Sequence, residues 1–129
     1  MAKTKQFTIA IHHQPGAVSE IAKILGNAKV NILALLGTTQ GMAGTVQFVA
    51  DDPRRAKKAL DAARIAYQET PAESYDLPNK PGALAQCLEK LASKGVNLNS
   101  IHATAAKGGR KAVVVYTVDA AARAATATA

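Results

Sequence analysis

A segment that occurs twice constrains this chain more than any other feature. Residues 15–35 align with residues 81–101 at an offset of 66, and six of these 21 positions are identical. The identical pairs are Pro15/Pro81, Gly16/Gly82, Ala17/Ala83, Leu25/Leu91, Val30/Val96 and Asn31/Asn97. Further on, the offset becomes 68, so that Phe48 aligns with Tyr116 and Asp51 with Asp119. Because a repeat at a fixed spacing indicates one structural unit used twice, the 129 residues are predicted to form two small units, 1–70 and 71–129.

The first copy has the apolar periodicity of six elements. Alternating apolar residues predict strands at 5–12, 30–39, 45–50 and 65–68, and helical spacing predicts helices at 18–25 and 53–63. Pro15 and Gly16 interrupt the chain before the first helix. Asp52 is a good N-cap for the second helix, and Pro53 suits its first position. The predicted order is strand-helix-strand-strand-helix-strand.

The second copy repeats this order but is shorter. It has predicted strands at 73–78, 96–104 and 111–118, a helix over 83–91 and a hairpin turn at Gly108-Gly109. Asp119 is expected to cap a short Ala-rich helix, and the 11 residues 119–129 leave no room for a closing strand. The fold class is therefore predicted as α+β, with two tandem ferredoxin-like βαββαβ units, the second lacking its last strand.

The buried faces of these elements define a predicted core without tryptophan. Its members are the apolar residues that recur on one face of each strand or helix, namely Phe7, Ile9, Ile11, Val18, Ile21, Leu25, Val46, Phe48, Leu84, Leu88, Leu91, Val114 and Tyr116. Leu33, Leu35, Val113 and Val115 are expected on the sheet face that helices leave bare, where apolar residues predict a homodimer interface.

The repeated Pro-Gly turn is the candidate binding element. The first turn of a helix has free backbone N–H groups and a positive dipole end, both of which suit a carboxylate, and a glycine lets a ligand approach closely. Strand-end carbonyls, or the side-chain amides of Asn31, Asn79 and Asn97, can accept hydrogen bonds from an ammonium group. Together these groups are matched to a free amino acid.

The same residues resemble a known family, the ACT domains, which are small regulatory modules that bind amino acids in metabolic enzymes. The resemblance is carried by Leu77, Pro78, Asn79, Lys80, Pro81, Gly82, Ala83 and Leu84, followed by Leu91, Gly95, Val96, Asn97, Leu98 and Ile101. It covers nearly the whole chain as two tandem units without a catalytic domain. It implies an amino-acid-binding regulatory protein whose pockets lie between units.

The resemblance implies a set of ligand-binding residues from both copies. They are Gln14, Gly16, Ala17, Asn31, Ile32, Asn79, Gly82, Ala83, Asn97 and Leu98. The first copy departs from the family pattern, because His13-Gln14 stands where an Asn- or Asp-containing turn is common. A metabolic enzyme or regulator is the implied partner of such a sensor.

Two other functions fit the fold and stay open from the sequence. A net charge of +7 on this topology is compatible with an RNA-recognition module, although each central strand carries only one aromatic residue. A purely structural or partner-binding scaffold needs no ligand at all. A comparison of binding to RNA at two salt concentrations separates the first of these from an amino-acid sensor.

Other features argue against catalysis, a metal, a cofactor or a membrane. His12 and His13 point to opposite faces of a strand and cannot readily share one ion with His102 or with each other. Cys87 falls on the apolar face of its helix, where a buried thiol is expected rather than a nucleophile. No apolar run is long enough to span a bilayer, and one cysteine forms no internal disulfide, so a cytoplasmic location is expected.

Overall fold

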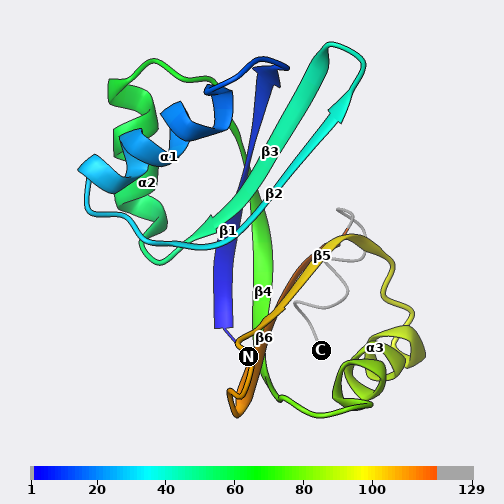
Figure 1. Ribbon diagram of the computed structural model, residues 1–129. Helices are drawn as coiled ribbons and strands as arrows, with labels where there is room; N and C mark the ends of the chain where they lie inside the picture. Colours follow the sequence, from blue (N-terminus) through cyan, green and yellow to red (C-terminus); the bar gives the residue numbers. More distant parts are fainter. Residues whose placement is uncertain (1, 119–129) are drawn as a thin grey trace. The chain divides into compact units, whose positions relative to one another are not determined.

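The computed structural model describes residues 2–118, which form six strands and three helices (Figure 1). In chain order they are β1 (Ala2–His12), α1 (Ala17–Asn27), β2 (Ile32–Gln40), β3 (Ala43–Ala50), α2 (Pro53–Ala62), β4 (Gln68–Pro78), α3 (Ala83–Ser93), β5 (Leu98–Ala105) and β6 (Lys111–Val118). The predicted helix capped by Asp119 falls outside the described residues. The described chain confirms the predicted α+β fold of ferredoxin-like units, the second of which has no strand after β6 within residues 72–118.

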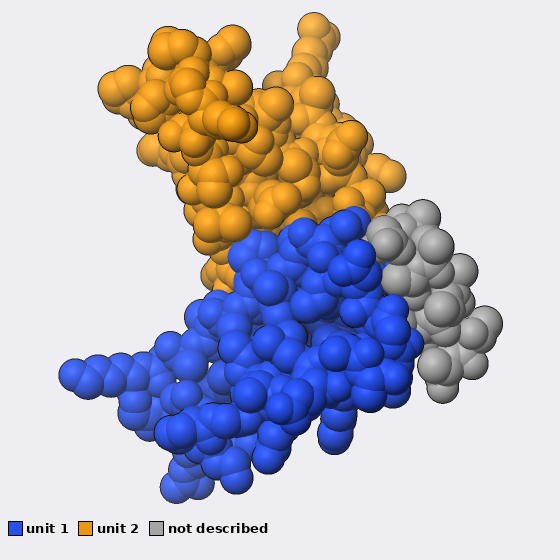
Figure 2. Space-filling model, turned by 90° about the vertical axis from the view of Figure 1, so that its right-hand side faces the viewer, with its two compact units in different colours: residues 1–3, 72–129 blue, residues 4–71 orange. Residues whose placement is uncertain are grey.

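The chain divides into two compact units (Figure 2). Residues 4–71 form the N-terminal unit, drawn in orange, and the remaining described residues form the C-terminal unit, drawn in blue. The strand order is β2-β3-β1-β4 in the N-terminal unit and β4-β6-β5 in the C-terminal unit, so β4 contributes to both. The pairs β1/β3, β2/β3, β4/β6 and β5/β6 are antiparallel.

Strand β4 corrects one sequence prediction. Residues 65–68 and 73–78 were expected to be separate strands, but residues 65–67 are irregular and a single strand runs from Gln68 to Pro78. Thr70 and Pro71 suggest a break between two strands, and the structure shows that the chain stays extended through them. Proline is compatible with an extended backbone because its φ is held near the strand region.

The N-terminal unit has the larger core. Phe7 from β1 and Phe48 from β3 are opposite each other in the ladder, fully buried and stacked with ring centroids 5.1 Å apart. Helices α1 and α2 cover this face, adding Ile21, Leu25 and Leu60 to the same cluster. Burial of such side chains is worth about 1.5–3 kcal/mol each, so both helices contribute to the stability of this unit.

The C-terminal unit has a smaller cluster, of Leu91, Tyr116 and Val118, with Cys87 and Leu88 packed against it. One predicted core residue is misplaced: Leu84 is 39% exposed, because α3 turns Ala83 and Leu91 inward instead. Nine of the predicted core residues are buried, while Ile11, Val18 and Leu88 are half-buried.

Two of the four apolar residues that were expected on the sheet face without helices do not form an exposed surface there. Val115 is only 4% exposed, so it adds nothing to an open apolar surface. Leu35 is paired with the buried Phe48, and paired residues share a face, so Leu35 lies on the helix-covered side of the sheet. Leu33 and Val113 are exposed as expected.

The repeat is reproduced in the backbone at both ends of the first helix of each unit. Gly16 and Gly82 precede α1 and α3 with φ angles of 86° and 87°. At the other end, Val30 N donates to Leu25 O and Val96 N donates to Leu91 O, each at 3.0 Å. Lys29 and Gly95, one residue earlier, have φ angles of 64° and 72°. Both helices therefore end in the same left-handed turn, although one of them places a lysine there.

The lysine in this turn generates a stability prediction. A non-glycine residue at positive φ costs about 1–2 kcal/mol, and glycine removes that cost at an entropic penalty of about 0.5–1 kcal/mol. Lys29→Gly should therefore raise the free energy of unfolding by about 0.5–1 kcal/mol in a urea titration. The matched variant Gly95→Lys should lower it by a similar amount. A loss of stability in Lys29→Gly would show that the lysine side chain, not the backbone, matters at this position.

Candidate functional site

The two Pro-Gly turns have the same local geometry. Ala17 N donates to Gln14 O and Ala83 N donates to Lys80 O, both at 3.3 Å. One turn later, Glu20 N donates to Gly16 O at 2.9 Å and Gln86 N donates to Gly82 O at 3.0 Å. A Cβ added to either glycine would meet no atom within 4 Å. Glycine is therefore required at both positions because of the positive φ angle and not for lack of space, since the volume beside each glycine is open.

The first turns of α1 and α3 differ from that of α2 in how their N–H groups are used. The Asp52 side chain accepts a hydrogen bond from Arg55 N at 3.1 Å and so caps α2, as predicted. Neither Gly16 nor Gly82 has a side chain, and no side chain caps α1 or α3. Backbone N–H groups in these two first turns are thus left for an outside acceptor, and the helix dipole favours an anionic one.

A small hollow of about 160 Å³ lies beside the turn of the C-terminal unit. Asn79, Lys80 and Ala83 line it from the turn and the start of α3, and Thr104 lines it from β5. Lys80 brings a positive charge to this turn, at the position that Gln14 occupies in the first copy. The sequence pattern gave no reason to include Thr104, since only the register of β5 on β6 brings it to this end of the sheet.

The Asn79 side chain makes hydrogen bonds within the unit through its amide nitrogen. Its side-chain Nδ2 donates to Gly109 O at 2.9 Å and to Ala106 O at 3.4 Å, and its backbone N donates to Arg110 O at 2.9 Å. The residue therefore ties the helix-opening turn to the β5–β6 hairpin. In the N-terminal unit, His13 N donates to Met42 O at 3.1 Å, which is the equivalent of the backbone hydrogen bond from Asn79 N to Arg110 O. The first copy has histidine at this position and therefore lacks the additional hydrogen bonds of an asparagine side chain.

The two halves of the predicted site are far apart within one unit. Gly82 and Ala83 lie where Pro78 pairs with Lys111, whereas Asn97 and Leu98 lie at the other end of β5, where Leu98 pairs with Val118. The seven-residue step along β5 spans roughly 23 Å. The same separation holds in the N-terminal unit between Gly16-Ala17 and Asn31-Ile32. One small ligand can therefore contact either the turn or the strand start of a given unit, but it cannot contact both.

Asn31 and Asn97 open the equivalent strands β2 and β5. The backbone of Asn31 is held by Asp51, whose Oδ1 accepts from Asn31 N at 2.9 Å and whose N donates to Asn31 O at 3.0 Å. Asn97 is exposed, and within residues 2–118 the side-chain amides of Asn31 and Asn97 have no hydrogen-bond partner. These amides are thus available to a ligand group at the strand end.

No group of three or more His, Cys, Asp or Glu side chains in the described chain is arranged to hold a metal ion. None of its helices is long and apolar enough to cross a membrane. Of the three histidines, His102 on β5 is the unusual one. Both of its ring nitrogens are buried, with no hydrogen-bond partner among the described residues, and this burial lowers the pKa of the imidazole from its ordinary value.

Two ferredoxin-like units, each with a left-handed Pro-Gly turn before its first helix, define a protein of the ACT class. The chain belongs to the ACT domain pair family, which it matches over residues 2–128. This membership confirms the resemblance seen in the sequence and supports a regulatory, ligand-binding role. A search of curated proteins found no match.

Solved structures share the fold over nearly the whole chain. Protein BT0572 from Bacteroides thetaiotaomicron superposes with a TM-score of 0.82 at 27% identity, covering 94% of this chain and 83% of that one. The ligand-free regulatory subunit of aspartate kinase from Thermus thermophilus gives a TM-score of 0.66 at 19% identity, covering 97% and 91%. The corresponding subunit from Thermus flavus gives 0.62 at 19%, with the same coverages. At 19% identity the similarity is one of fold.

The burial of His102 predicts how stability depends on pH. The unfolded chain takes up a proton on this residue below about pH 6.5, whereas the folded chain keeps the ring neutral to a lower pH. Since the unfolded state then binds more protons, stability should fall as the pH drops below about 6.5, by at most about 1.4 kcal/mol per pH unit from this residue.

The variant His102→Gln isolates this contribution. Urea titrations at pH 7.5 and 5.5 should show that the wild-type protein loses more stability on acidification than the variant does. Identical losses in the two proteins would show that the ring is not shielded from water in the folded state.

Proposed function

We propose that this chain is a non-catalytic regulatory protein that binds a small amino acid at the Pro-Gly turns of its ACT units. The observation that carries the proposal is the duplicated, uncapped helix start, with the same backbone angles and hydrogen bonds at Gly16 and Gly82. Two copies of a left-handed turn that leave N–H groups unpaired are better explained by a shared ligand chemistry than by folding alone.

The amino acid is held at its two charged ends. Its carboxylate accepts hydrogen bonds from the backbone N–H groups of the first helical turn. Its ammonium donates to backbone carbonyls and to the amide oxygen of Asn31 or Asn97 at the start of a strand. Since one unit cannot supply both halves, the ligand bridges the turn of one ACT unit and the strand start of another. Binding then favours one arrangement of units, as regulation requires.

The two turns are not equivalent in this proposal. Lys80 adds a positive charge beside the second turn, where the first copy has the neutral Gln14. A carboxylate is therefore bound more strongly at the Pro-Gly turn that contains Gly82 than at the one that contains Gly16. The hollow lined by Asn79 and Thr104 is a place for a short side chain of the ligand.

An RNA-binding role has less support. RNA-recognition modules of this topology stack bases on exposed aromatic residues of the central strands. Here the aromatic residues of β3 and β6, Phe48 and Tyr116, are 0% and 2% exposed. Their rings are occupied in the cores of the two units and offer no stacking surface.

A thermal-shift screen of the twenty amino acids tests the function. A ligand that binds only the folded protein at ten times its Kd stabilises it by about 1.4 kcal/mol, which raises the melting midpoint by about 5 °C. One or a few small amino acids should give this shift at millimolar concentration. If none of the twenty does so, a scaffold or partner-binding role is favoured instead.

Two glycine variants show where the ligand binds. Gly82→Val should abolish the shift, because its side chain projects into the open space beside the turn. Gly41→Val is the matched control, since Gly41 is also at positive φ with open space around it but lies in the β2–β3 turn, outside the proposed ligand-binding residues. Both variants lose stability from backbone strain, and only Gly82→Val should lose the ligand response.

We also propose that the protein assembles as a homodimer through β2. This strand is at the end of the sheet order, and it exposes Leu33, Leu35 and Leu36 by 53%, 41% and 44%. An apolar, unpaired strand edge is a surface that proteins cover. A dimer brings further ACT units together and thus supplies more pairs of turn and strand start. A cytoplasmic metabolic enzyme or regulator is the proposed downstream partner.

Sedimentation velocity tests the dimer. The wild-type protein should sediment as a dimer at micromolar concentration, and Leu36→Lys should shift it to a monomer by placing a charge on the strand edge. Met42→Lys is the control, because Met42 is 78% exposed at the β2–β3 turn, beyond the leucines. A monomeric wild-type protein would refute the proposal.

A further inference from the structure

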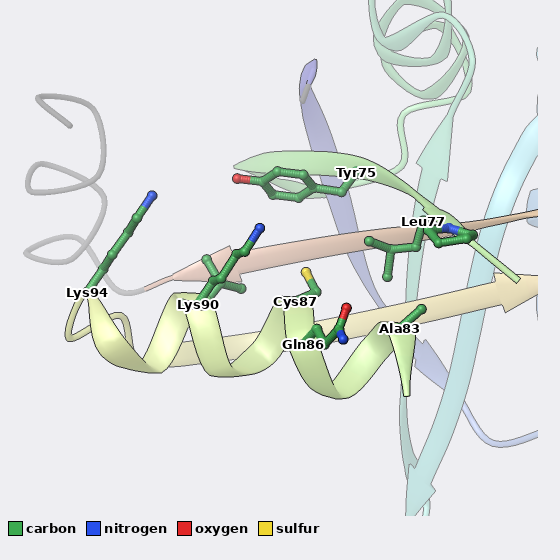
Figure 3. A pocket seen from close by; sticks show the side chains of 9 residues that line it. Tyr75, Leu77, Ala83, Gln86, Cys87, Lys90 and Lys94 are labelled. Atoms are coloured by element: carbon green, nitrogen blue, oxygen red, sulfur yellow. The ribbon is translucent and has the colours of Figure 1, made fainter. Parts of the chain in front are cut away.

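The helix-bearing face of the C-terminal unit contains a second, larger cavity. It has a volume of about 410 Å³ and lies between α3 and β4 (Figure 3). It shares Leu77, Pro78 and Ala83 with the hollow at the turn, but it extends from there along α3 to Lys94, the residue that follows the helix. Its volume is in the range of small-molecule sites in proteins, about 300–1,000 Å³.

The repeat shows how this cavity arises. In the N-terminal unit, the equivalent face of α1 is covered by α2, and Ile21 joins Ala56 and Leu60 in one buried cluster. At the offset of 66, α3 has Cys87 in place of Ile21 and Lys90 in place of Ile24. A small thiol thus stands where the first unit has the isoleucine that joins the cluster with α2, and an ammonium group stands where it has Ile24.

A third exchange follows the same pattern, since Lys94 stands where α1 has Ala28, which packs against the first core. Lys90 and Lys94 are one helical turn apart and both line the cavity. Both lysines are exposed, and their flexible side chains can direct an ammonium group to a partner of opposite charge. The face is therefore suited to an occupant that is itself charged.

The charge of that occupant follows from the lining. Among residues 2–118, no acidic residue lines the cavity and neither lysine forms an ion pair. Glu73, on the same face of β4 as Tyr75, already accepts a hydrogen bond of 2.7 Å from the hydroxyl of Tyr116. Burial and this contact raise the pKa of the Tyr116 hydroxyl, so it remains a neutral donor to that carboxylate.

The body of the occupant is apolar and flat. Leu77, Ala83 and Leu91 line the cavity with apolar side chains, and Tyr75 adds an aromatic ring to this lining. This ring is already stacked on Tyr116, with centroids 5.8 Å apart and planes inclined by 9°, so it is held in position. Figure 3 shows Cys87 and Lys90 extending from α3 toward β4, where Tyr75 and Leu77 lie.

We propose that this cavity binds an aromatic carboxylate that lacks an α-ammonium group, as a second effector distinct from the amino acid at the turns. The carboxylate pairs with Lys90 and Lys94, and the ring lies between Tyr75 and the apolar wall of α3 and β4. An amino acid is rejected, because its ammonium would face two lysines with no acidic residue to receive it.

The single cysteine of the chain gives a local readout. Cys87 lines the cavity and is half-buried, so an occupant should slow its alkylation by iodoacetamide, a neutral reagent. Three ligands of similar shape separate charge from apolar contact: 3-phenylpropionate, phenylalanine and 3-phenylpropan-1-ol. The full chain is incubated with each at up to 10 mM, about the range for a ligand of this size, and the alkylation rate is followed by mass spectrometry.

Only 3-phenylpropionate is expected to protect Cys87 in a saturable manner. The double variant Lys90→Glu/Lys94→Glu should weaken this protection at least about tenfold, since charge-assisted contacts are lost and repulsion is added. The control Lys23→Glu/Lys58→Glu changes the net charge equally at exposed lysines of α1 and α2 and should leave protection within twofold.

Each contrary result overturns the proposal. Equal protection by the alcohol would show a merely apolar cavity, and equal protection by phenylalanine would show that the ammonium is not rejected. No protection by the carboxylate, or unchanged protection in the Lys90/Lys94 variant, would show that the two lysines bind no anion there. A Cys87 that resists alkylation without any ligand would show that the cavity is covered. These outcomes are independent of the amino-acid screen, which reads the turn at Gly82.

Discussion

The left-handed backbone at both ends of the first helix in each unit is the constraint on which this structure depends. Gly16 and Gly82 reverse the chain from the strand into the helix, and Lys29 and Gly95 reverse it again toward the next strand. With both reversals in place, Ile32 and Leu98 start their strands at equivalent points opposite β3 and β6, and each strand has the same irregularity in register directly after that first residue. The ladder and the packing of the helix on the sheet follow from these four residues.

The two units use this shared frame for different interiors. The Phe7–Phe48 stack of the first is matched in the second by Glu73 and Tyr116, which form a hydrogen bond instead. The first unit has two helices over its sheet and an apolar cluster between them. In the second, α3 carries polar and charged residues on the corresponding face, and a cavity remains there. The two copies thus share their backbone and differ in their interiors, one with a larger apolar cluster and the other with a buried hydrogen bond and a cavity.

The separation of turn and strand start within a unit has a consequence for regulation. In the proposed function, the groups that bind the two ends of an amino acid lie roughly 23 Å apart along one strand, so that this binding would require more than one unit. A ligand held in this way contributes its binding free energy to one arrangement of units over another, and that difference is what a regulatory module passes on. In that proposal, the position of the glycine turns at one sheet end, and of Asn31 and Asn97 at the other, would link ligand binding to the assembly of units.

The sequence by itself determined the repeat, the fold class and the two helix-opening turns, because each depends on local chemistry: apolar periodicity, the positive φ that glycine permits, and the capping of α2 by Asp52. It also indicated most core positions, since burial on a strand follows from alternation. Only the tertiary structure decided that residues 68–78 form one strand, that Asn79 braces a hairpin, that Thr104 joins the hollow at the turn, and that Lys90 and Lys94 share a cavity with Tyr75. These features depend on the register of β6 between β4 and β5 and on the packing of α3, which bring together residues far apart in the chain, and no local pattern encodes such pairings.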